Sequence, residues 1–236
     1  MEGFGTGGPA VGTMPVAERF VSVNGEGPRA GSFSAFVRFR GCNLACSYCD
    51  TQWACQPGCP VEELDPGELA SWVLGQQTPC ATLTGGEPLL QPLLPELVRR
   101  LLQREGLTVE VETNGACGVE ELAALRAAGP GTLALTLDCK APSSGMAGQM
   151  LESNYALLGA DDCVKFVVGC EADLEAAAQA IERHGLLERC PVYLSPVFAA
   201  IEPAAIVGFL QERGLLRARV QLQLHKLIWP GVEKGV

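Results

Sequence analysis

Three cysteines stand close together directly after a segment with the composition of a strand. Cys42, Cys46 and Cys49 have the spacing C-x-x-x-C-x-x-C. Three thiolates on one short loop can ligate three irons of a 4Fe–4S cluster and leave the fourth iron open to a small chelating ligand. A structural zinc site is the alternative, and it would need a fourth ligand from Cys55 or Cys59. We expect these two cysteines to lie on a loop that covers the cluster.

Three polar clusters follow the next three predicted strands. They are Thr84-Gly85-Gly86-Glu87-Pro88, Glu112-Thr113-Asn114-Gly115 and Asp138-Cys139-Lys140. The loops at the carboxyl ends of parallel barrel strands converge on one face, where such a fold collects its chemistry. An ordinary turn before a helix is the structural alternative for the two glycines. The repeated placement at strand ends predicts one active site on that face.

The elements that must position these residues alternate along the chain. The patterns predict strands at 34–39, 80–84, 107–112, 132–137, 163–168, 191–194 and 220–224. They predict helices at 65–75, 93–104, 119–128, 149–158, 173–184 and 203–213, the first with Asp65 as N-cap and Pro66 at its first position. Six βα steps and a last strand predict an α/β fold whose parallel sheet forms a partial or open barrel.

Length and composition restrict the possible classes of protein. The 236 residues are 47% hydrophobic and 19% charged, which fits one globular domain and excludes intrinsic disorder. A formal charge of −10 argues against a general nucleic-acid binder, and no apolar run is long enough to span a membrane. Residues 1–14 contain five glycines and no Lys or Arg. We expect them to form a disordered extension, with Met14 as an alternative start, and residues 15–236 to form the single domain.

The eleven cysteines point to a reducing compartment. Their number is odd and their density is too low for a disulfide scaffold, and residues 1–14 lack the features of a secretory signal. We therefore expect a cytoplasmic protein whose cysteines are free thiols or metal ligands. Six of them lie outside the cysteine loop and should mostly fill the core: Cys80, Cys117, Cys139, Cys163, Cys170 and Cys190.

The cysteine loop and the strand ends together resemble the radical S-adenosylmethionine (radical SAM) superfamily. In that superfamily the open iron chelates the amine and carboxylate of the cofactor's methionine, and a GGEP motif, here Gly85 to Pro88, binds the methionyl amine. The resemblance implies a radical-SAM-type partial (βα)6 barrel with parallel strands and a C-terminal extra strand.

Four further segments resemble one family within it, the 7-carboxy-7-deazaguanine synthases. They are Val23-Asn24-Gly25-Glu26-Gly27, Cys49-Asp50-Thr51, Pro142-Ser143-Ser144-Gly145-Met146 and the tail from Gln223 to Trp229. The likeness covers about residues 15–236. It departs from the family at Asn24, where many members carry Gln, an amide with the same donors and acceptors.

The resemblance implies a lyase that converts 6-carboxy-5,6,7,8-tetrahydropterin to 7-carboxy-7-deazaguanine and ammonia, on the route to deazapurine nucleosides of tRNA such as queuosine. In the implied mechanism a 5′-deoxyadenosyl radical takes a hydrogen from the pterin, the ring contracts, and the hydrogen returns. The cofactor supplies the difficult chemistry, and the protein supplies position and a dry pocket.

The same resemblance places residues around three ligands. Cys42, Cys46 and Cys49 would hold the 4Fe–4S cluster. The residues placed around S-adenosylmethionine are Tyr48, Cys49, Asp50, Gly86, Glu87, Glu112, Asp138, Cys139, Lys140, Ser195, Pro196, Val197 and Phe198. Those placed around the pterin are Val23, Asn24, Gly25, Arg38, Thr84, His225 and the terminal carboxylate of Val236. Thr51 would bind Mg²⁺ through its hydroxyl. A flavodoxin or ferredoxin would donate the electron, and a homodimer is usual in the family.

Simpler interpretations remain open for several residues. Arg38 could be a strand residue paired with a neighbouring acid, His225 a structural histidine, and Glu26 a solvated loop charge. For the whole chain, the nearest alternative is an activating enzyme for glycyl-radical enzymes, which would act on a protein partner. The alternative from another class is a non-enzymatic iron–sulfur or zinc protein, which would not bind S-adenosylmethionine.

Overall fold

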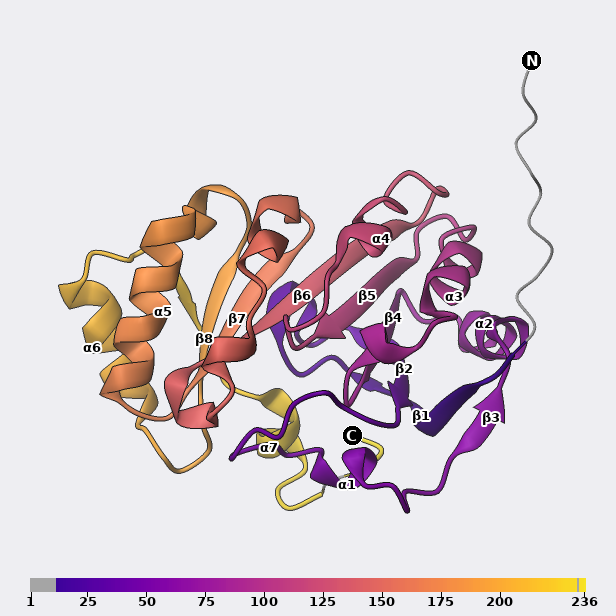
Figure 1. The fold of residues 1–236 in the computed structure, drawn as a ribbon, viewed down its shortest axis with the longest axis horizontal. Coiled ribbons are helices and arrows are strands. Elements are labelled where there is room, and N and C mark those ends of the chain that lie inside the picture. The colour runs from indigo at the N-terminus through magenta and orange to yellow at the C-terminus, as the bar shows by residue number, and fades with distance from the viewer. Residues whose placement is uncertain (1–11, 233) are drawn as a thin grey trace.

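A computed structural model describes residues 12–232 and 234–236 of the chain. Its centre is one nine-stranded sheet in the order β3-β1-β2-β4-β5-β6-β7-β8-β9 (Figure 1). The strands are β1 (Met14–Val23), β2 (Phe33–Phe39), β3 (Glu62–Leu64), β4 (Cys80–Gly85), β5 (Thr108–Thr113), β6 (Thr132–Lys140), β7 (Cys163–Val168), β8 (Val192–Pro196) and β9 (Arg219–Val220). From β2 to β9 every pairing is parallel. The linear order leaves the sheet open, so the fold is the predicted α/β partial barrel.

The helices follow the parallel strands. They are α1 (Gln52–Cys55), α2 (Pro66–Gly75), α3 (Leu94–Leu101), α4 (Glu120–Ala123), α5 (Glu171–His184), α6 (Pro203–Glu212) and α7 (Leu224–Ile228). Short 3-10 turns are η1 (Gly27–Arg29), η2 (Pro88–Leu90), η3 (Pro142–Ser144), η4 (Ala147–Gln149), η5 (Glu152–Leu157) and η6 (Leu186–Glu188). Helix α2 begins as predicted: Asp65 accepts hydrogen bonds from the backbone of Gly67 and Glu68, and Glu68 accepts one from the backbone of Asp65.

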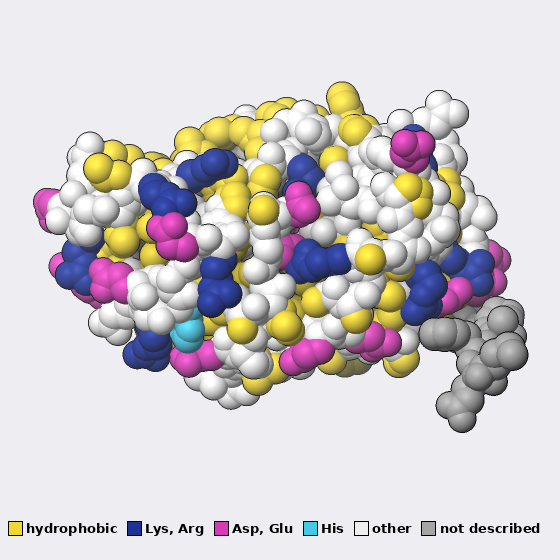
Figure 2. Space-filling view, turned by 90° about the horizontal axis from the view of Figure 1, so that it is seen from above, with side chains coloured by type: hydrophobic (Ala, Val, Ile, Leu, Met, Phe, Trp, Pro, Cys, Tyr) yellow, Lys and Arg dark blue, Asp and Glu magenta, His cyan; other side chains and the backbone are white. Residues whose placement is uncertain are grey.

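Alternation along the strands separates an apolar face from a polar one. Outward-facing residues such as Leu83, Val111 and Leu135 are fully buried in the core together with Leu97 of α3 and Ile181 of α5. The neighbouring inward residues are mostly polar, so the interior of the partial barrel is a polar space suited to a site. On the outer face seen in Figure 2, acidic and basic side chains are mixed with apolar ones. Within the described ranges, no helix is both long and apolar enough to cross a bilayer.

Several predicted boundaries are wrong. The two antiparallel strands at one side of the sheet, β1 and the edge strand β3, have no counterpart in the prediction. In β1 a bulge between Val16 and Glu18 breaks the alternation on which strand prediction relies, and β3 has only three residues. The predicted helices at 119–128 and 149–158 shrink to α4 and to the 3-10 turn η5, and the predicted strand at 220–224 stops at Val220.

The predicted start of the folded domain is also wrong. Met14 is the first residue of β1 and its side chain is fully buried, so the folded part begins before residue 15. Thr13 already donates a hydrogen bond of 2.9 Å to Glu63 of β3. The expectation of disorder for the residues before 12 lies outside the described residues.

Candidate active site

The loop after β2 carries the three closely spaced cysteines at the carboxyl end of the first parallel strand. The thiols of Cys42, Cys46 and Cys49 are free and half-buried. The loop is fixed from the far side of the sheet, because Ser47 donates its backbone N–H to the Ser144 carbonyl after β6 at 3.1 Å. The three thiols are therefore presented where the strands β2 to β6 end.

Amide donors surround one of the three thiols. Asn114 Nδ2 lies 3.5 Å from Cys42 Sγ and also donates to Asn43 Oδ1 at 2.8 Å. The backbone N–H of Leu44 lies 3.4 Å from the same sulfur. The polar cluster after β5 thus contacts the cysteine loop directly.

Cys55 and Cys59 lie beside this loop. Cys55 is the last residue of α1, with Sγ 3.7 Å from the Thr51 carbonyl, and Cys59 is buried with Sγ 3.4 Å from the Pro60 carbonyl. In the part of the chain that the structure describes, no three His, Cys, Asp or Glu side chains converge tightly enough to hold a single metal ion. Burial and the neighbouring thiols of Cys42 and Cys49 raise the pKa of Cys55, so this cysteine lies close to the cysteine loop.

The other six cysteines divide in two. Cys80, Cys139, Cys163 and Cys190 are buried, as predicted for core fillers. Cys117 is half-buried and lies 3.5 Å from the amide of Asn43, and Cys170 is exposed at the N-cap of α5. For these last two the prediction is wrong, because each lies in a loop rather than within a strand.

The glycines after β4 allow two strand ends to meet. Gly85 has φ +156°, and a Cβ on it would overlap the backbone of Phe39. A Cβ on Gly86 would overlap the carbonyl of Gly41. Gly86 N donates to the Phe39 carbonyl at 3.1 Å, and Glu87 N donates to the Gly41 carbonyl at 2.8 Å. The two glycines therefore hold the turn against the start of the cysteine loop, which an ordinary turn would not require.

Glu87 fixes this turn to the end of β5. Its fully buried carboxylate accepts hydrogen bonds from Thr113 Oγ1 at 2.9 Å, Asn114 N at 2.7 Å and Leu89 N at 3.0 Å. Burial raises the pKa of Glu87, although these three donors oppose the shift. The side chain is engaged within the protein, and the backbone of the turn is the part that lies along the cysteine loop.

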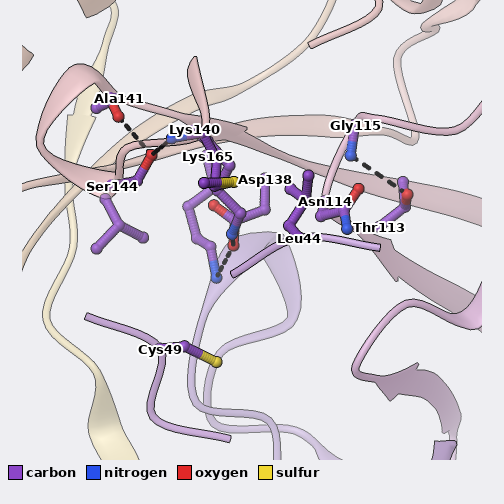
Figure 3. Close-up of polar contacts among 12 residues, drawn as sticks. Leu44, Cys49, Thr113, Asn114, Gly115, Asp138, Lys140, Ala141, Ser144 and Lys165 are labelled. Carbon is purple, nitrogen blue, oxygen red and sulfur yellow. Dashed lines mark hydrogen bonds and ion pairs between the residues drawn. The ribbon is translucent and has the colours of Figure 1, made fainter. Parts of the chain in front are cut away.

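Two lysines share one oxygen of Asp138 (Figure 3). Lys140 Nζ lies 2.6 Å and Lys165 Nζ 4.0 Å from Asp138 Oδ2. Burial alone would raise the pKa of Asp138, but the two ammonium groups hold it below the ordinary value. The other oxygen, Oδ1, is buried and has no hydrogen-bond partner among the described residues. Asp138 is therefore an ionised acceptor with one oxygen available to a ligand.

Glu26 reaches the same region from the segment between β1 and β2. Its carboxylate lies 2.8 Å from Lys165 Nζ and accepts a hydrogen bond from Ser195 Oγ at 3.2 Å. Only 13% of the Glu26 side chain is exposed. The interpretation of Glu26 as a solvated loop charge is therefore wrong, since this carboxylate is part of a buried ion pair.

Gly25 and His225 are brought together by a close backbone contact. The Gly25 carbonyl accepts a hydrogen bond from Leu224 N at 3.1 Å, and a Cβ on Gly25 would lie 2.9 Å from His225 Nδ1. Burial lowers the pKa of His225. The neighbouring Asn24 turns away: its Nδ2 lies 2.6 Å from Glu110 Oε2 below.

Arg38 of β2 and Glu112 of β5 lie on the two strands that flank Thr84 of β4. Arg38 Nε lies 2.8 Å from Glu18 on the neighbouring strand, so the structure contains the pairing with an acid that the simpler interpretation expects. Burial raises the pKa of Glu112 to about 7, assisted by Glu110 and opposed by Lys165 and a hydrogen bond with Thr84.

The C-terminal tail closes over this edge of the barrel, where α7, α1 and the C-terminus appear together in Figure 1. Gly235 N donates to Glu18 Oε2 at 3.2 Å, which brings the half-buried Val236 near the partner of Arg38. Lys226 of α7 lies 3.5 Å from Asp50 in the cysteine loop. The tail therefore contacts both β1 and the cysteine loop.

Some residues placed around S-adenosylmethionine do not share the inner face. Cys139 contacts Tyr155 Oη at 2.9 Å, on the side of β6 opposite Asp138. Phe198 is 71% exposed, and the Lys226 ammonium lies 5.9 Å from its ring centroid. Tyr48 donates from its hydroxyl to the Val167 carbonyl at 3.1 Å.

The remaining residues of these predicted sites lie at strand ends or in the cysteine loop. Val23 ends β1, Pro196 ends β8, and Val197 N donates to the Val168 carbonyl at 2.8 Å. The hydroxyl of Thr51 lies 3.6 Å from Cys49 Sγ.

The inward side chains form two layers. The lower layer, near the amino ends of the strands, consists of Ser34, Thr82, Glu110, Thr136 and Cys163, closed by Asn24 and Arg29. The upper layer consists of Glu26, Arg38, Thr84, Glu112, Asp138, Lys140, Lys165 and Ser195. Sequence analysis missed Arg29, Glu110 and Lys165. Lys165 had a signal, a single charged residue inside an apolar strand pattern, because such a charge is rarely buried without a partner.

Three observations fit these residues to the predicted groups. Three free thiols share one loop, and the two glycines keep Cβ atoms out of the contact between that loop and the next strand end. The buried Oδ1 of Asp138 lacks a donor among the described residues. An iron–sulfur cluster needs such thiols, and a ligand that bears hydroxyl and ammonium groups, as S-adenosylmethionine does, offers donors of the kind that this oxygen needs.

Comparison with known proteins gives one consistent group of relatives. Residues 36–142 match the model of the Radical SAM superfamily. The 7-carboxy-7-deazaguanine synthase of Clostridium acetobutylicum is 40% identical over 221 residues, which cover 94% of this chain and 98% of the relative. The protein of the same name from Chlorobaculum tepidum is 38% identical over 226 residues, covering 94% and 97%.

A solved structure supports the fold. The crystal structure of QueE from Escherichia coli superposes with a TM-score of 0.67, covering 89% of this chain and 94% of that one at 20% identity. At this identity the likeness concerns the fold alone. It agrees with the open, mostly parallel sheet described above.

Proposed function

The chain belongs to the 7-carboxy-7-deazaguanine synthase family of radical SAM enzymes, and we propose that it converts 6-carboxy-5,6,7,8-tetrahydropterin to 7-carboxy-7-deazaguanine and ammonia. The observation that carries the proposal is the match of nearly the full chain to the relative from Clostridium acetobutylicum. The pathway is deazapurine biosynthesis of the queuosine type. The cysteine loop and the ionised Asp138 beneath it are the local features that support this activity.

Cys42, Cys46 and Cys49 would hold the 4Fe–4S cluster. When bound, the cluster and S-adenosylmethionine supply the reductive radical chemistry that starts the ring contraction. The chain's own contribution is to fix the cysteine loop through Ser47 and Asn114, and to present amide donors to the Cys42 sulfur. Three cysteine ligands would leave the fourth iron open to the cofactor.

Asp138 and the backbone of the Gly85-Gly86 turn would orient S-adenosylmethionine. Asp138 Oδ1 is a buried charged acceptor, and such an atom is stabilised strongly by a donor from a ligand. Lys140 keeps this carboxylate ionised from the other oxygen. Ser195 and Glu112 lie on the same inner face and would complete the polar surface around the cofactor.

The pterin would lie between Thr84, His225 and the tail. Gly25 allows close packing of His225, whose lowered pKa favours the neutral imidazole, able both to donate and to accept. Arg38 would bind the substrate carboxylate through guanidinium nitrogens other than Nε, which faces Glu18. The Val236 carboxylate would approach from the tail. Asn24 would act by holding the preceding backbone in place, since its amide is directed toward Glu110.

Mg²⁺ would bind near the hydroxyl of Thr51, which lies next to Cys49 at the cluster loop. Mg²⁺ keeps few protein ligands and shares oxygens of substrates, so one threonine is compatible with its preferences. Turnover in metal-free buffer should fall when magnesium is chelated and return when it is added back. Unchanged turnover would exclude this role of Thr51.

A small one-electron carrier of the flavodoxin or ferredoxin type would reduce the cluster, and the protein would act in the cytoplasm as a homodimer. Support for a reducing compartment comes from the eleven cysteines, whose odd number cannot pair completely and whose density is too low for a disulfide scaffold. Analytical ultracentrifugation of the cluster-loaded protein would test the dimer.

The decisive experiment is an anaerobic assay of the reconstituted enzyme with 6-carboxytetrahydropterin and S-adenosylmethionine. We expect ammonia and 7-carboxy-7-deazaguanine, identified by mass spectrometry, without net consumption of S-adenosylmethionine. Radical formation on a partner protein instead would favour a glycyl-radical activating enzyme. A cluster whose EPR signal does not respond to S-adenosylmethionine would favour a non-enzymatic iron–sulfur protein.

A further inference from the structure

A buried ammonium group connects two parts of the upper layer. Lys165 lies in the middle of β7, with 9% of its side chain exposed. Its Nζ lies 2.8 Å from Glu26 Oε2 and 4.0 Å from Asp138 Oδ2. Figure 3 shows Lys165 beside Asp138 and Lys140. A buried lysine is costly unless it is paired, and here a single ammonium serves two carboxylates.

The two carboxylates belong to different ligand sites of the proposed reaction. Glu26 directly follows Gly25, in the segment placed against the pterin, and Asp138 belongs to the cofactor side. Glu26 also accepts a hydrogen bond from Ser195 at 3.2 Å. A continuous polar chain therefore runs from Asp138 through Lys165 and Glu26 to Ser195, across β6, β7, the segment after β1, and β8.

We propose that Lys165 is a positioning residue that fixes the carboxylates of Glu26 and Asp138 relative to each other, and thereby the pterin relative to S-adenosylmethionine. The proposal rests on the proposed function and deepens it. Hydrogen transfer between two bound molecules requires the reacting atoms to be held about 3–3.5 Å apart. A shared cation keeps two acceptors at a fixed separation, and Lys140, whose ammonium lies 2.6 Å from Asp138, forms no ion pair with Glu26 among the described residues.

The first test compares Lys165→Met, which keeps the length of the side chain, with Lys165→Arg, which keeps the charge. Binding of S-adenosylmethionine is read from the EPR signal of the reconstituted cluster, and the KM of the pterin from product formation. We expect Lys165→Met to weaken the binding of S-adenosylmethionine and to raise the KM of the pterin, each by about 10-fold or more. Lys165→Arg should recover most of each loss. Arg217→Met, an exposed change at the amino ends of the strands, should leave both values unchanged.

A second set of variants separates positioning from a structural role and does not depend on folding of Lys165→Met. If Lys165 links the two sites, Glu26→Gln should weaken the binding of S-adenosylmethionine by about 5-fold or more. Asp138→Asn should raise the KM of the pterin by a similar factor. In the Lys165→Met background both cross-effects should disappear, because the connection is already broken.

The proposal is overturned if the cross-effects are absent, if they persist in the Lys165→Met background, or if Lys165→Met lowers only the melting temperature. Absence of 7-carboxy-7-deazaguanine from the wild-type reaction would instead overturn the proposed function. In that event the binding of S-adenosylmethionine to Lys165→Met, Lys165→Arg and Glu26→Gln still decides the role of Lys165, because this readout needs no turnover.

Discussion

The two layers of the barrel interior hold carboxylates in opposite conditions. In the lower layer, Glu110 accepts hydrogen bonds from Arg29 at 2.7 Å, Thr136 at 2.6 Å and Asn24 at 2.6 Å. In the upper layer, Asp138 leaves one buried oxygen without a partner among the described residues, and Glu112 has a raised pKa. Glu110 and Glu112 are two residues apart on the same strand and the same face.

The difference separates stability from function along a single strand. A carboxylate whose two oxygens both have donors stabilises the fold, and one with an oxygen that lacks a donor is held ready for a ligand at a cost in stability. The lower layer also closes the bottom of the barrel and anchors the segment from Asn24 to Arg29. Its satisfied contacts therefore hold Gly25 and Glu26 in place above it.

The largest expected effect lies above both layers, at the cysteine loop. Cys46→Ala removes one of the three cluster ligands, so the reconstituted protein should lose nearly all cluster iron and all detectable turnover. Circular dichroism of the cluster-free protein should show the wild-type fold, because the stabilising contacts lie below. Retained turnover would refute the assignment of Cys46 as a ligand.

The next effect concerns the lower layer. Glu110→Ala leaves the Arg29 guanidinium buried without its carboxylate, and the loss should be about 3–5 kcal/mol in the free energy of unfolding, measured with urea on the cluster-free protein. Adding Arg29→Met should restore part of the loss, since the unpaired charge is then removed. A loss below about 1 kcal/mol would contradict the stabilising role of this layer.

The same contrast explains what the sequence could predict. The order of the parallel strands, the cap at Asp65 and the convergence of the cysteine loop with the later strand ends follow from local patterns and from the rule for parallel barrels. Strand β1 does not, because its bulge hides the alternation, and β3 is too short to have a pattern.

The roles of individual polar side chains were harder to predict. Asn24 and Arg38 carry the right chemistry for a ligand, yet their observed partners are Glu110 and Glu18, chosen by contacts between distant segments. The pairing of Lys165 with Glu26 joins residues 139 positions apart. The spacing of residues along the chain does not predict such a partner. The sequence does show that a lysine lies inside an apolar strand, which is unusual.

Arg38, at the rim of the upper layer, provides a smaller and more specific effect. Arg38→Ala should weaken pterin binding by about 1.5–3 kcal/mol if a charged hydrogen bond to the substrate carboxylate is lost, seen as an increase in KM. Because the side chains of Arg38 and Glu18 are only 13% and 15% exposed, the loss of this pair should also lower the free energy of unfolding, by more than the roughly 1 kcal/mol of an exposed pair. Glu18→Gln serves as the control that breaks the pair and keeps the guanidinium. An unchanged KM for Arg38→Ala would restrict Arg38 to its pairing with Glu18.

The smallest effect tests the upper layer through pH. Because burial raises the pKa of Glu112 to about 7, the folded protein keeps this proton between about pH 4.5 and 7 while the unfolded chain releases it, so stability falls as pH rises through that window. Glu112→Gln cannot lose a proton, and the variant should therefore gain about 1–2 kcal/mol relative to wild type at pH 8, but little at pH 4.5. Urea unfolding of the cluster-free proteins at both pH values measures the difference, with the exposed Glu121→Gln as control. An equal difference at the two pH values would mean that Glu112 is as well satisfied as Glu110, and the contrast between the layers would fail at the position where they are closest in sequence.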